Sequence, residues 1–286
     1  MNIKTGGYTY LESITDEDWI KLCTNGEAPQ SIDILENEYL ILQDPSGTHH
    51  YYKKSNGVLK VIPFPGFTNY NVGEIKPRNP QQYCAMDMCM DPRSPVKLIS
   101  GTYGAGKDFL MLNAAFKLLS DGVYDKILYI RNNIEVANTV PLGRLPGEKE
   151  EKLRPFLAAL TDHVGGWDGL EQLMYMGKIE AEHLGYLRGR NIQNTIIYVT
   201  EAENLTKEHI QLLLGRVGER SALWLNGDYR QVDKEIFKRN SGMLTLTRAL
   251  ANNPLFAYVD LPKTERSAVA ALADELDRYT EEHPKK

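Results

Sequence analysis

Residues 101–108, GTYGAGKD, constrain the fold of this chain more than any other stretch. They match the pattern G-x-x-x-x-G-K-[ST] at both glycines and at Lys107, between an apolar strand (96–99) and a helix (109–119). Glycines let backbone N–H groups turn toward a phosphate, and the first turn of a helix adds a partial positive charge. The stretch therefore predicts a P-loop in which Lys107 reaches the β- and γ-phosphates of a nucleoside triphosphate. The expected nucleotide contacts are Gly101, Thr102, Tyr103, Gly104, Ala105, Gly106, Lys107, Asp108 and Phe109.

From residue 83 onward, predicted strands alternate with predicted helices. The strands are expected at 96–99, 126–131, 179–180, 195–199 and 222–226, and a helix near 241–252 is expected to complete the core. This order favours an α/β fold, a RecA-like core whose parallel sheet is covered by helices on both faces.

The chain before the P-loop has a different texture. A short helix is expected after Thr15, and residues 38–62 indicate two or three short antiparallel strands. Residues 64–82 are rich in Pro, Gly and Asn, which is typical of a linker. We therefore divide the chain into a small N-terminal α+β segment (1–72) and a P-loop NTPase domain (73–286).

Charge, cysteine content and hydropathy narrow the functional classes. The net charge of −5 argues against a surface devoted to nucleic acid, although it allows a local basic track. The three cysteines form no closed disulfide set and no CxxC pair, and no apolar run approaches a membrane span. The first residues lack the layout of a secretory signal. We expect a cytoplasmic protein with no membrane partner.

The last position of the P-loop departs from its pattern. Asp108 stands where Ser or Thr usually holds Mg²⁺. In IIYVTEAEN (196–204), Thr200 stands where the strand-end aspartate of such proteins is expected, and Glu201 follows it. We hypothesise that the two positions have exchanged hydroxyl and carboxylate, so that Asp108, Thr200 and Glu201 surround the metal. The alternative is decay of the site.

Several stretches together resemble the PhoH-like family of P-loop ATPases. They are IKPRNPQQ, GTYGAGKD, YIRNNIEVANTVPLGRLPGEKEEKLRPFL, EHLGYLRGRNIQNTIIYVTEAENLT and NGDYRQVD followed by SGM, within about residues 75–275. The resemblance implies a RecA-like core, ATP and Mg²⁺ as ligands, ATP hydrolysis and a role in RNA unwinding or metabolism. It also implies a homo-oligomer, such as a hexameric ring. Some longer relatives carry an N-terminal PIN nuclease joined through a β segment similar to residues 38–62. Because the first 30 residues are too short for that nuclease, we expect no nuclease activity.

The resemblance and the strand ends together suggest further site residues. Glu201 is the candidate to polarise the attacking water, with a solvated strand-end residue as the alternative. Asp228 and Gln231 follow a strand end and are candidate γ-phosphate sensors, with a capped turn as the alternative. Gln82 is the candidate for adenine recognition, with Gln81 in second place, and a helix-capping segment is the alternative.

Arginines supply candidate phosphate contacts, because their planar guanidinium groups stay charged. Arg190 and Arg188 are candidates for a finger reaching a neighbouring subunit's ATP or for RNA contacts, with a salt-bridged structural role as the alternative. Arg266 is a further candidate finger. Arg131 is a candidate for contact with nucleic acid or phosphate, with a plain surface arginine as the alternative. Six further basic residues could line a track that binds RNA, with a solvent-exposed face as the alternative. They are Arg216, Arg220, Arg230, Lys234, Lys238 and Arg239.

Two remaining motifs have simpler interpretations. Ser241 and Gly242 begin a helix that either faces the nucleotide or is merely capped by the serine. His49 and His50 are adjacent on a strand and point to opposite faces, so we interpret them as surface or packing residues.

The leading functional prediction is a Mg²⁺-dependent ATPase that acts on single-stranded RNA. The alternative is an ATP-binding regulator or scaffold with weak or no hydrolysis, which Asp108 and Thr200 favour. A small-molecule kinase is third, because the sequence shows no clear arginine-rich lid.

Overall fold

The computed structural model describes residues 6–29, 32–131, 149–265 and 272. Contacts divide the chain into two compact units, each assembled from separate segments. Unit 1 comprises Met1–Gly66, Lys76–Lys107 and Thr247–Lys286, and unit 2 comprises Phe67–Ile75 and Asp108–Leu246. The contiguous division at residue 72 stays a prediction.

A six-stranded sheet confirms the predicted α/β fold. Its strands are β7 (Val96–Gly101), β8 (Lys126–Arg131), β9 (Ile179–Glu182), β10 (Thr195–Thr200), β11 (Ala222–Gly227) and β12 (Phe256–Leu261). Their order is β12-β7-β11-β10-β8-β9, and the β12–β7, β11–β10, β10–β8 and β8–β9 pairs are parallel. Every residue of β7, β10 and β11 is buried, which is typical of parallel strands covered on both faces.

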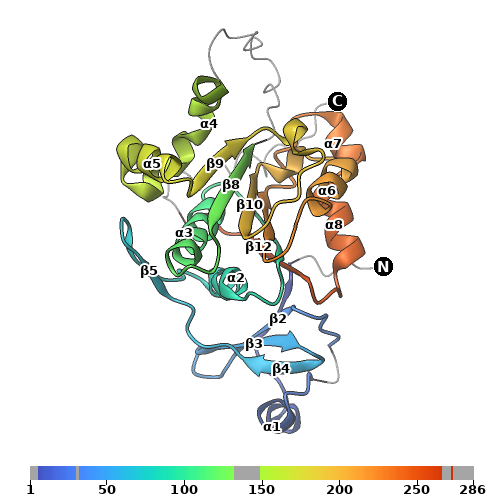
Figure 1. Ribbon diagram of the computed structural model, residues 1–286. Helices are drawn as coiled ribbons and strands as arrows, with labels where there is room; N and C mark the ends of the chain where they lie inside the picture. Colours follow the sequence, from blue (N-terminus) through green and yellow to red (C-terminus); the bar gives the residue numbers. More distant parts are fainter. Residues whose placement is uncertain (1–5, 30–31, 132–148, 266–271, 273–286) are drawn as a thin grey trace. The chain divides into compact units, whose positions relative to one another are not determined.

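Helices alternate with these strands along the chain (Figure 1). They are α2 (Pro80–Met90), α3 (Lys107–Ser120), α4 (Lys149–Val164), α5 (Gly166–Tyr175), α6 (Lys207–Leu214), α7 (Glu235–Arg239) and α8 (Gly242–Leu250). In unit 1, α2 contacts β7 and β12, and in unit 2, α4 and α5 contact each other and β9. Among the described helices, none has the length and hydropathy needed to cross a bilayer.

The expectation that the helix near 241–252 completes the core is wrong. β12 follows that helix and pairs with β7 from Phe256 opposite Val96 to Leu261 opposite Gly101. The run FAYVDL, which follows the turn residues of 252–254, carries a strand signal that the prediction omitted. The prediction also omitted the short helix α7.

The N-terminal region forms a four-stranded sheet in the order β1-β2-β3-β4. The strands are β1 (Tyr8–Leu11), β2 (Tyr39–Gln43), β3 (His49–Ser55) and β4 (Val58–Val61). The antiparallel β2–β3 and β3–β4 pairs confirm the expectation for residues 38–62, whereas the parallel strand β1 was not expected. The predicted helix is α1 (Asp16–Asn25), and the side chain of Thr15 caps it by accepting a hydrogen bond from the Asp18 N–H.

The expected linker at 64–82 instead contains a hairpin of β5 (Phe67–Asn69) and β6 (Gly73–Ile75). Phe67, Asn69 and Ile75 are buried, and the Asn69 side chain donates to Asn113 Oδ1 of α3 at 2.8 Å. The sequence of this segment is typical of a loop because it contains few apolar residues. Phe67 and Ile75, which are among those few, are nevertheless buried in unit 2.

A buried ionic cluster ties the N-terminal sheet to the P-loop strand within unit 1. Lys53 of β3 donates to Asp91 Oδ2 at 2.6 Å, and Arg93 donates to the same oxygen at 2.8 Å. Lys97 of β7 donates to the carbonyl oxygens of Asp91 and Ser94 at 2.6 and 2.7 Å. The segment after α2 therefore joins β3 to β7.

Candidate functional site

The P-loop joins β7 to α3, and contacts within unit 1 fix its backbone. A Cβ at Gly101 would lie 2.4 Å from the carbonyl oxygen of Leu261, and the Thr102 N–H donates to that oxygen at 3.2 Å. Gly104 (φ 65°) and Gly106 (φ 91°) are left-handed. In the part of the chain that the structure describes, the N–H groups of these two glycines have no hydrogen-bond partner. Amides in such a turn suit a bound anion.

The side chain of Lys107 lies over the same loop. Its ammonium donates to the carbonyl oxygens of Gly101 at 2.7 Å and Thr102 at 3.0 Å. The ammonium group of Lys107 is therefore hydrogen-bonded to the backbone of the same loop that is predicted to bind phosphate.

Gln82, the candidate for adenine recognition, contacts the P-loop itself. Its Nε2 donates to the carbonyl oxygen of Ala105 at 3.0 Å, and its Oε1 accepts from the Arg78 N–H at 2.9 Å. The residue is 4% exposed, so both ends of its amide are used inside unit 1. Burial raises the pKa of Tyr8, and the side chain of Gln81 opposes that effect. The geometry supports a bracing role for Gln82 beside its predicted one.

The end of the chain segment in unit 1 braces the loop from another direction. The Glu265 N–H donates to the carbonyl oxygen of Gly104 at 3.0 Å, and the Thr264 hydroxyl donates to that of Tyr103 at 2.6 Å. Tyr103 is 44% exposed. The next candidate, Arg266, lies outside the described residues.

Asp108 and Thr200 lie together in unit 2. The Thr200 hydroxyl is 3.4 Å from Asp108 Oδ1, so the fold brings this hydroxyl and this carboxylate into contact. Two further donors reach the same oxygen: the Tyr198 hydroxyl at 2.8 Å and Asn226 Nδ2 at 2.9 Å. Asn226 Nδ2 also lies 2.5 Å from the Tyr198 oxygen, and Thr200 Oγ1 lies 3.2 Å from Asn226 Oδ1.

Strand geometry explains this convergence. Residues two apart on a strand share a face, so Tyr198 and Thr200 of β10 point the same way. Val199 is paired with Leu225, which places Asn226 of β11 beside Thr200 at the ends of the two strands. Tyr198 and Asn226 were not predicted from the sequence, although a polar residue such as Asn226 at the end of an apolar strand is a usable signal.

Glu201 follows β10 in a left-handed backbone conformation, with φ 55° and ψ 42°. This conformation costs a non-glycine residue roughly 1–2 kcal/mol. Strained backbone conformations of this kind cluster at functional sites, so the conformation supports Glu201 as a functional residue but does not assign its role.

Asp228 and Gln231 lie together after β11. Gln231 Nε2 donates to Asp228 Oδ2 at 2.8 Å, and Arg230 donates to Asp228 Oδ1 through its backbone N–H at 3.0 Å. The Asp228 N–H donates in turn to Glu203 Oε2 at 3.1 Å. Glu203 belongs to the 3₁₀ turn η2 (Ala202–Asn204), so the segments that follow β10 and β11 are joined.

A second pair strengthens that junction. Asn204 Nδ2 donates to Asp233 Oδ2 at 2.8 Å, and the Asp233 N–H donates to Asn204 Oδ1 at 3.0 Å. The sequence analysis missed Glu203, Asn204 and Asp233, because a pairing between two loops leaves no local pattern.

The candidate arginines differ in their contacts. Arg190 lies 3.2 Å from Glu180 and 3.6 Å from Glu182, whereas exposed Arg188 forms no ion pair or hydrogen bond within the described residues. Burial raises the pKa of Glu180, but the Lys126 and Arg190 contacts outweigh it and lower that pKa below its usual value. The side chain of Arg131 is outside the described residues.

Much of the proposed basic track is engaged locally. Arg230 contacts Asp228, Lys238 and Arg239 lie beside Glu235, and Arg216 donates to the carbonyl oxygen of Arg190. The Ser241 hydroxyl accepts from the Leu244 N–H at 3.3 Å, as a helix-capping serine does.

The two adjacent histidines have separate packing contacts. His49 Nε2 is 2.9 Å from the Tyr10 hydroxyl, and His50 Nε2 is 3.0 Å from Asp44 Oδ2. The His50 ring also meets the Trp19 ring edge-on, at 5.3 Å between centroids.

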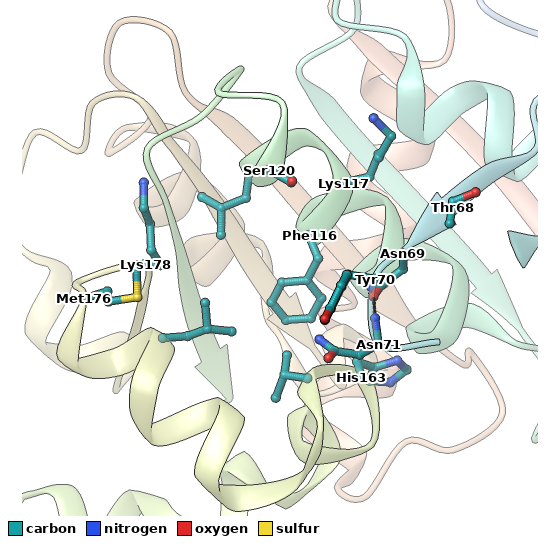
Figure 2. Close-up of a pocket in the computed structure, with 13 residues that line it drawn as sticks. Thr68, Asn69, Tyr70, Asn71, Phe116, Lys117, Ser120, His163, Met176 and Lys178 are labelled. Atoms are coloured by element: carbon teal, nitrogen blue, oxygen red, sulfur yellow. Dashed lines mark hydrogen bonds between the residues drawn. The ribbon is translucent and has the colours of Figure 1, made fainter. Parts of the chain in front are cut away.

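A pocket of about 280 Å³ in unit 2 was not expected from the sequence (Figure 2). The hairpin β5–β6, the second half of α3 and the ends of α4 and α5 line it. Phe116 points into the pocket, and His163 lies at its wall beside Asn71 (Figure 2). Asn113 links this wall to the start of α3, because its Nδ2 lies 3.0 Å from His163 Nδ1 and donates to the Phe109 carbonyl oxygen at 2.6 Å.

Comparison with known proteins identifies the family. The family model described as PhoH-like protein matches residues 74–275. The chain belongs to the PhoH-like family. Protein PhoH2 of Bacillus subtilis (strain 168) is 32% identical over 255 residues, which cover 84% of this chain and 56% of that protein. Protein PhoH2 of Mycolicibacterium smegmatis is 28% identical over 233 residues, which cover 80% and 53%.

A shorter relative matches less of the chain. The PhoH-like protein of Bacillus subtilis (strain 168) is 30% identical over 186 residues, which cover 64% of this chain and 57% of that protein. The chain thus spans about half the length of these relatives. Membership of the PhoH-like family indicates a P-loop NTPase that binds nucleotide.

The oxygen donors of unit 2 fit the metal ion that P-loop NTPases use. Asp108 offers a carboxylate, Thr200 a hydroxyl and Glu201 a second carboxylate, and Mg²⁺ prefers such hard oxygen ligands. Asp108 is half-buried and follows Lys107 directly in the chain.

Proposed function

We propose that this PhoH-like protein binds ATP with Mg²⁺ and hydrolyses it, and that single-stranded RNA stimulates the reaction. The observation that carries the proposal is the contact between Asp108 and Thr200. The Thr200 hydroxyl lies 3.4 Å from Asp108 Oδ1, so one hydroxyl and one carboxylate stand side by side, as the exchange hypothesis requires.

Each residue then has a role in the proposed reaction. The amides of Gly104 and Gly106 and the ammonium of Lys107 bind phosphate oxygens, while Asp108, Thr200 and Glu201 hold Mg²⁺. The bound ion would neutralise charge on the phosphates. Glu201 orients the attacking water, and Gln231, held by Asp228, senses the γ-phosphate.

We also propose a homo-oligomer, such as a hexameric ring, in which a neighbouring subunit supplies an arginine. Arg190 was the first candidate, but its guanidinium lies between Glu180 and Glu182. Arg188 is exposed and unpaired within the described residues, which favours it for the contact between subunits.

The test is phosphate release from ATP with and without single-stranded RNA, together with binding of a fluorescent ATP analogue. We expect Lys107→Ala to lose binding and turnover. Glu201→Gln should keep binding and lose turnover by about 100-fold or more, the contribution of a general base. RNA should raise the wild-type rate.

The runner-up is an ATP-binding regulator. Lys107 donates to two carbonyl oxygens of its own loop, and Asp108 Oδ1 accepts from Tyr198 and Asn226, so both groups have partners within the protein. Tight ATP binding with no turnover, with or without RNA, would overturn the hydrolytic proposal in favour of the regulator.

A further inference from the structure

The carboxylate of Asp108 is asymmetric in its contacts. Oδ1 receives Tyr198 Oη at 2.8 Å and Asn226 Nδ2 at 2.9 Å, with Thr200 Oγ1 at 3.4 Å. Within the described residues, no hydrogen bond reaches Oδ2. One oxygen is therefore saturated by donors and the other keeps its lone pairs.

The donors around Oδ1 are themselves satisfied in one consistent pattern. The two hydrogens of Asn226 Nδ2 go to Asp108 Oδ1 and to the Tyr198 oxygen, and the Tyr198 hydroxyl hydrogen goes to Asp108. The Thr200 hydrogen then goes to Asn226 Oδ1 at 3.2 Å, and no donor among the described residues reaches the lone pairs of Thr200 Oγ1. A hydroxyl that donates away from a metal can ligate it through those lone pairs.

Burial makes this arrangement rigid. Tyr198, Asn226 and Thr200 are 0%, 2% and 7% exposed, and all three stand on strands that are buried throughout. Asp108 stands on the first turn of α3 and is only half-buried. The rigid strand side chains thus hold an accessible carboxylate by one oxygen.

We propose that Tyr198 and Asn226 are positioning residues that hold Asp108 Oδ1, so that Oδ2, together with Thr200 Oγ1, ligates the Mg²⁺ of the bound nucleotide. The inference rests on the proposed function, because the ion enters with ATP. The hypothesis of an exchange at Asp108 and Thr200 thereby extends to four residues. A carboxylate on the P-loop needs hydrogen-bond donors beside it, whereas a hydroxyl would need an acceptor, and Tyr198 of β10 and Asn226 of β11 are such donors.

Binding of Mn²⁺ in the presence of a non-hydrolysable ATP analogue tests this, with free Mn²⁺ measured by electron paramagnetic resonance. Removing a residue that orients a metal ligand typically weakens metal affinity about 10–100-fold. We expect Tyr198→Phe to weaken Mn²⁺ binding about 10-fold and Asp108→Asn to weaken it further. Affinity for the analogue in EDTA should stay as in wild type in Tyr198→Phe.

The matched control is Tyr129→Phe. Tyr129 of β8 is opposite Tyr198 in register, and its ring stacks on the Tyr198 ring at 5.7 Å between centroids. Within the described residues, none of the hydrogen bonds to Asp108 comes from Tyr129. It should bind Mn²⁺ as wild type does. Asn226→Leu, of similar volume, serves as a second positioning variant, and melting without metal shows that each variant is folded.

Two results would overturn the inference. Unchanged Mn²⁺ affinity in Asp108→Asn would remove Asp108 as a ligand. A loss in Asp108→Asn alone, with Tyr198→Phe and Asn226→Leu both as tight as wild type, would remove the positioning role. Failure of the proposed function looks different: wild type would then bind the Mn²⁺–analogue complex with the expected variant pattern and yet release no phosphate from ATP.

Discussion

The interpretation of single residues in this protein depends on the residues they contact. Asp108 considered alone is a departure from the P-loop hydroxyl, and Thr200 considered alone is a departure from the strand-end aspartate. Their contact at 3.4 Å, with Asn226 and Tyr198 around them, makes them parts of one hydrogen-bonded set. The sequence suggested the exchange of hydroxyl and carboxylate as a hypothesis, but it did not predict that Tyr198 and Asn226 donate to Asp108.

Gln82 gives a prediction at the same scale. Its amide braces the Ala105 carbonyl oxygen at 3.0 Å, so Gln82→Ala should weaken ATP and GTP binding by the same factor, about 5-fold for one lost hydrogen bond. Competition binding of the two nucleotides measures this. Gln81→Ala, the neighbouring change, should leave both affinities unaltered.

A selective loss of ATP affinity in Gln82→Ala would contradict the bracing role. It would support the adenine recognition that the family resemblance implies.

Among the elements, the hairpin β5–β6 shows how a short apolar signal can mislead. Three buried residues and one hydrogen bond from Asn69 to Asn113 anchor it to α3, and the chain around it is otherwise rich in Pro, Gly and Asn. Asn113 extends the contact to His163 of α4. The hairpin, α3 and α4 therefore share one small polar network.

This network predicts a pH dependence. Burial lowers the pKa of His163, although the charges of Asp108 and Asp162 oppose that effect. Because the unfolded chain keeps a higher pKa than the folded one, it binds more protons as the pH falls below about 6.5, and the folded state loses stability.

We expect the free energy of unfolding by urea to fall more steeply between pH 7.5 and 5.5 in wild type than in His163→Gln. The difference cannot exceed about 1.4 kcal/mol per pH unit for one proton. Equal slopes in the two proteins would show that His163 is not the group responsible.

For the whole molecule, the compact units do not follow the order of the chain. The N-terminal sheet and the P-loop strand β7 belong to unit 1, together with β12 from the far end of the sequence. The ionic cluster around Asp91 joins β3 to β7 through Lys53 and Lys97. A division of the sequence into contiguous domains cannot find such a unit, because its last segment, Thr247–Lys286, follows Lys107 only after more than a hundred residues of unit 2.

Lys97 makes the stability of that unit depend on pH. The residue is 1% exposed, and burial lowers its pKa from 10.5 to about 7. Between pH 7 and 10.5 the unfolded chain binds more protons at this position than the folded chain, so its contribution to stability rises with pH.

The comparison of wild type with Lys97→Met isolates this contribution. The free energy of unfolding of wild type, relative to the variant, should rise by about 1 kcal/mol per pH unit between pH 7 and 8.5. Because both proteins contain the same buried tyrosines and cysteines, the contributions of those residues to the pH dependence cancel in the difference. A difference that stays flat or falls over this range would show that Lys97 remains charged in the folded protein.

The sequence by itself determined the P-loop, the alternation of strands and helices, the family, and the presence of a carboxylate at position 108 and a hydroxyl at position 200, because each of these depends on local residue identity and spacing. Only the tertiary structure decided what surrounds them. β12 beside Gly101, Gln82 against Ala105, Arg190 between Glu180 and Glu182, and Tyr198 with Asn226 on Asp108 all join residues far apart in the chain. Such contacts depend on which strand ends meet and on which donors are left without water, and neither is a property of any single stretch of sequence.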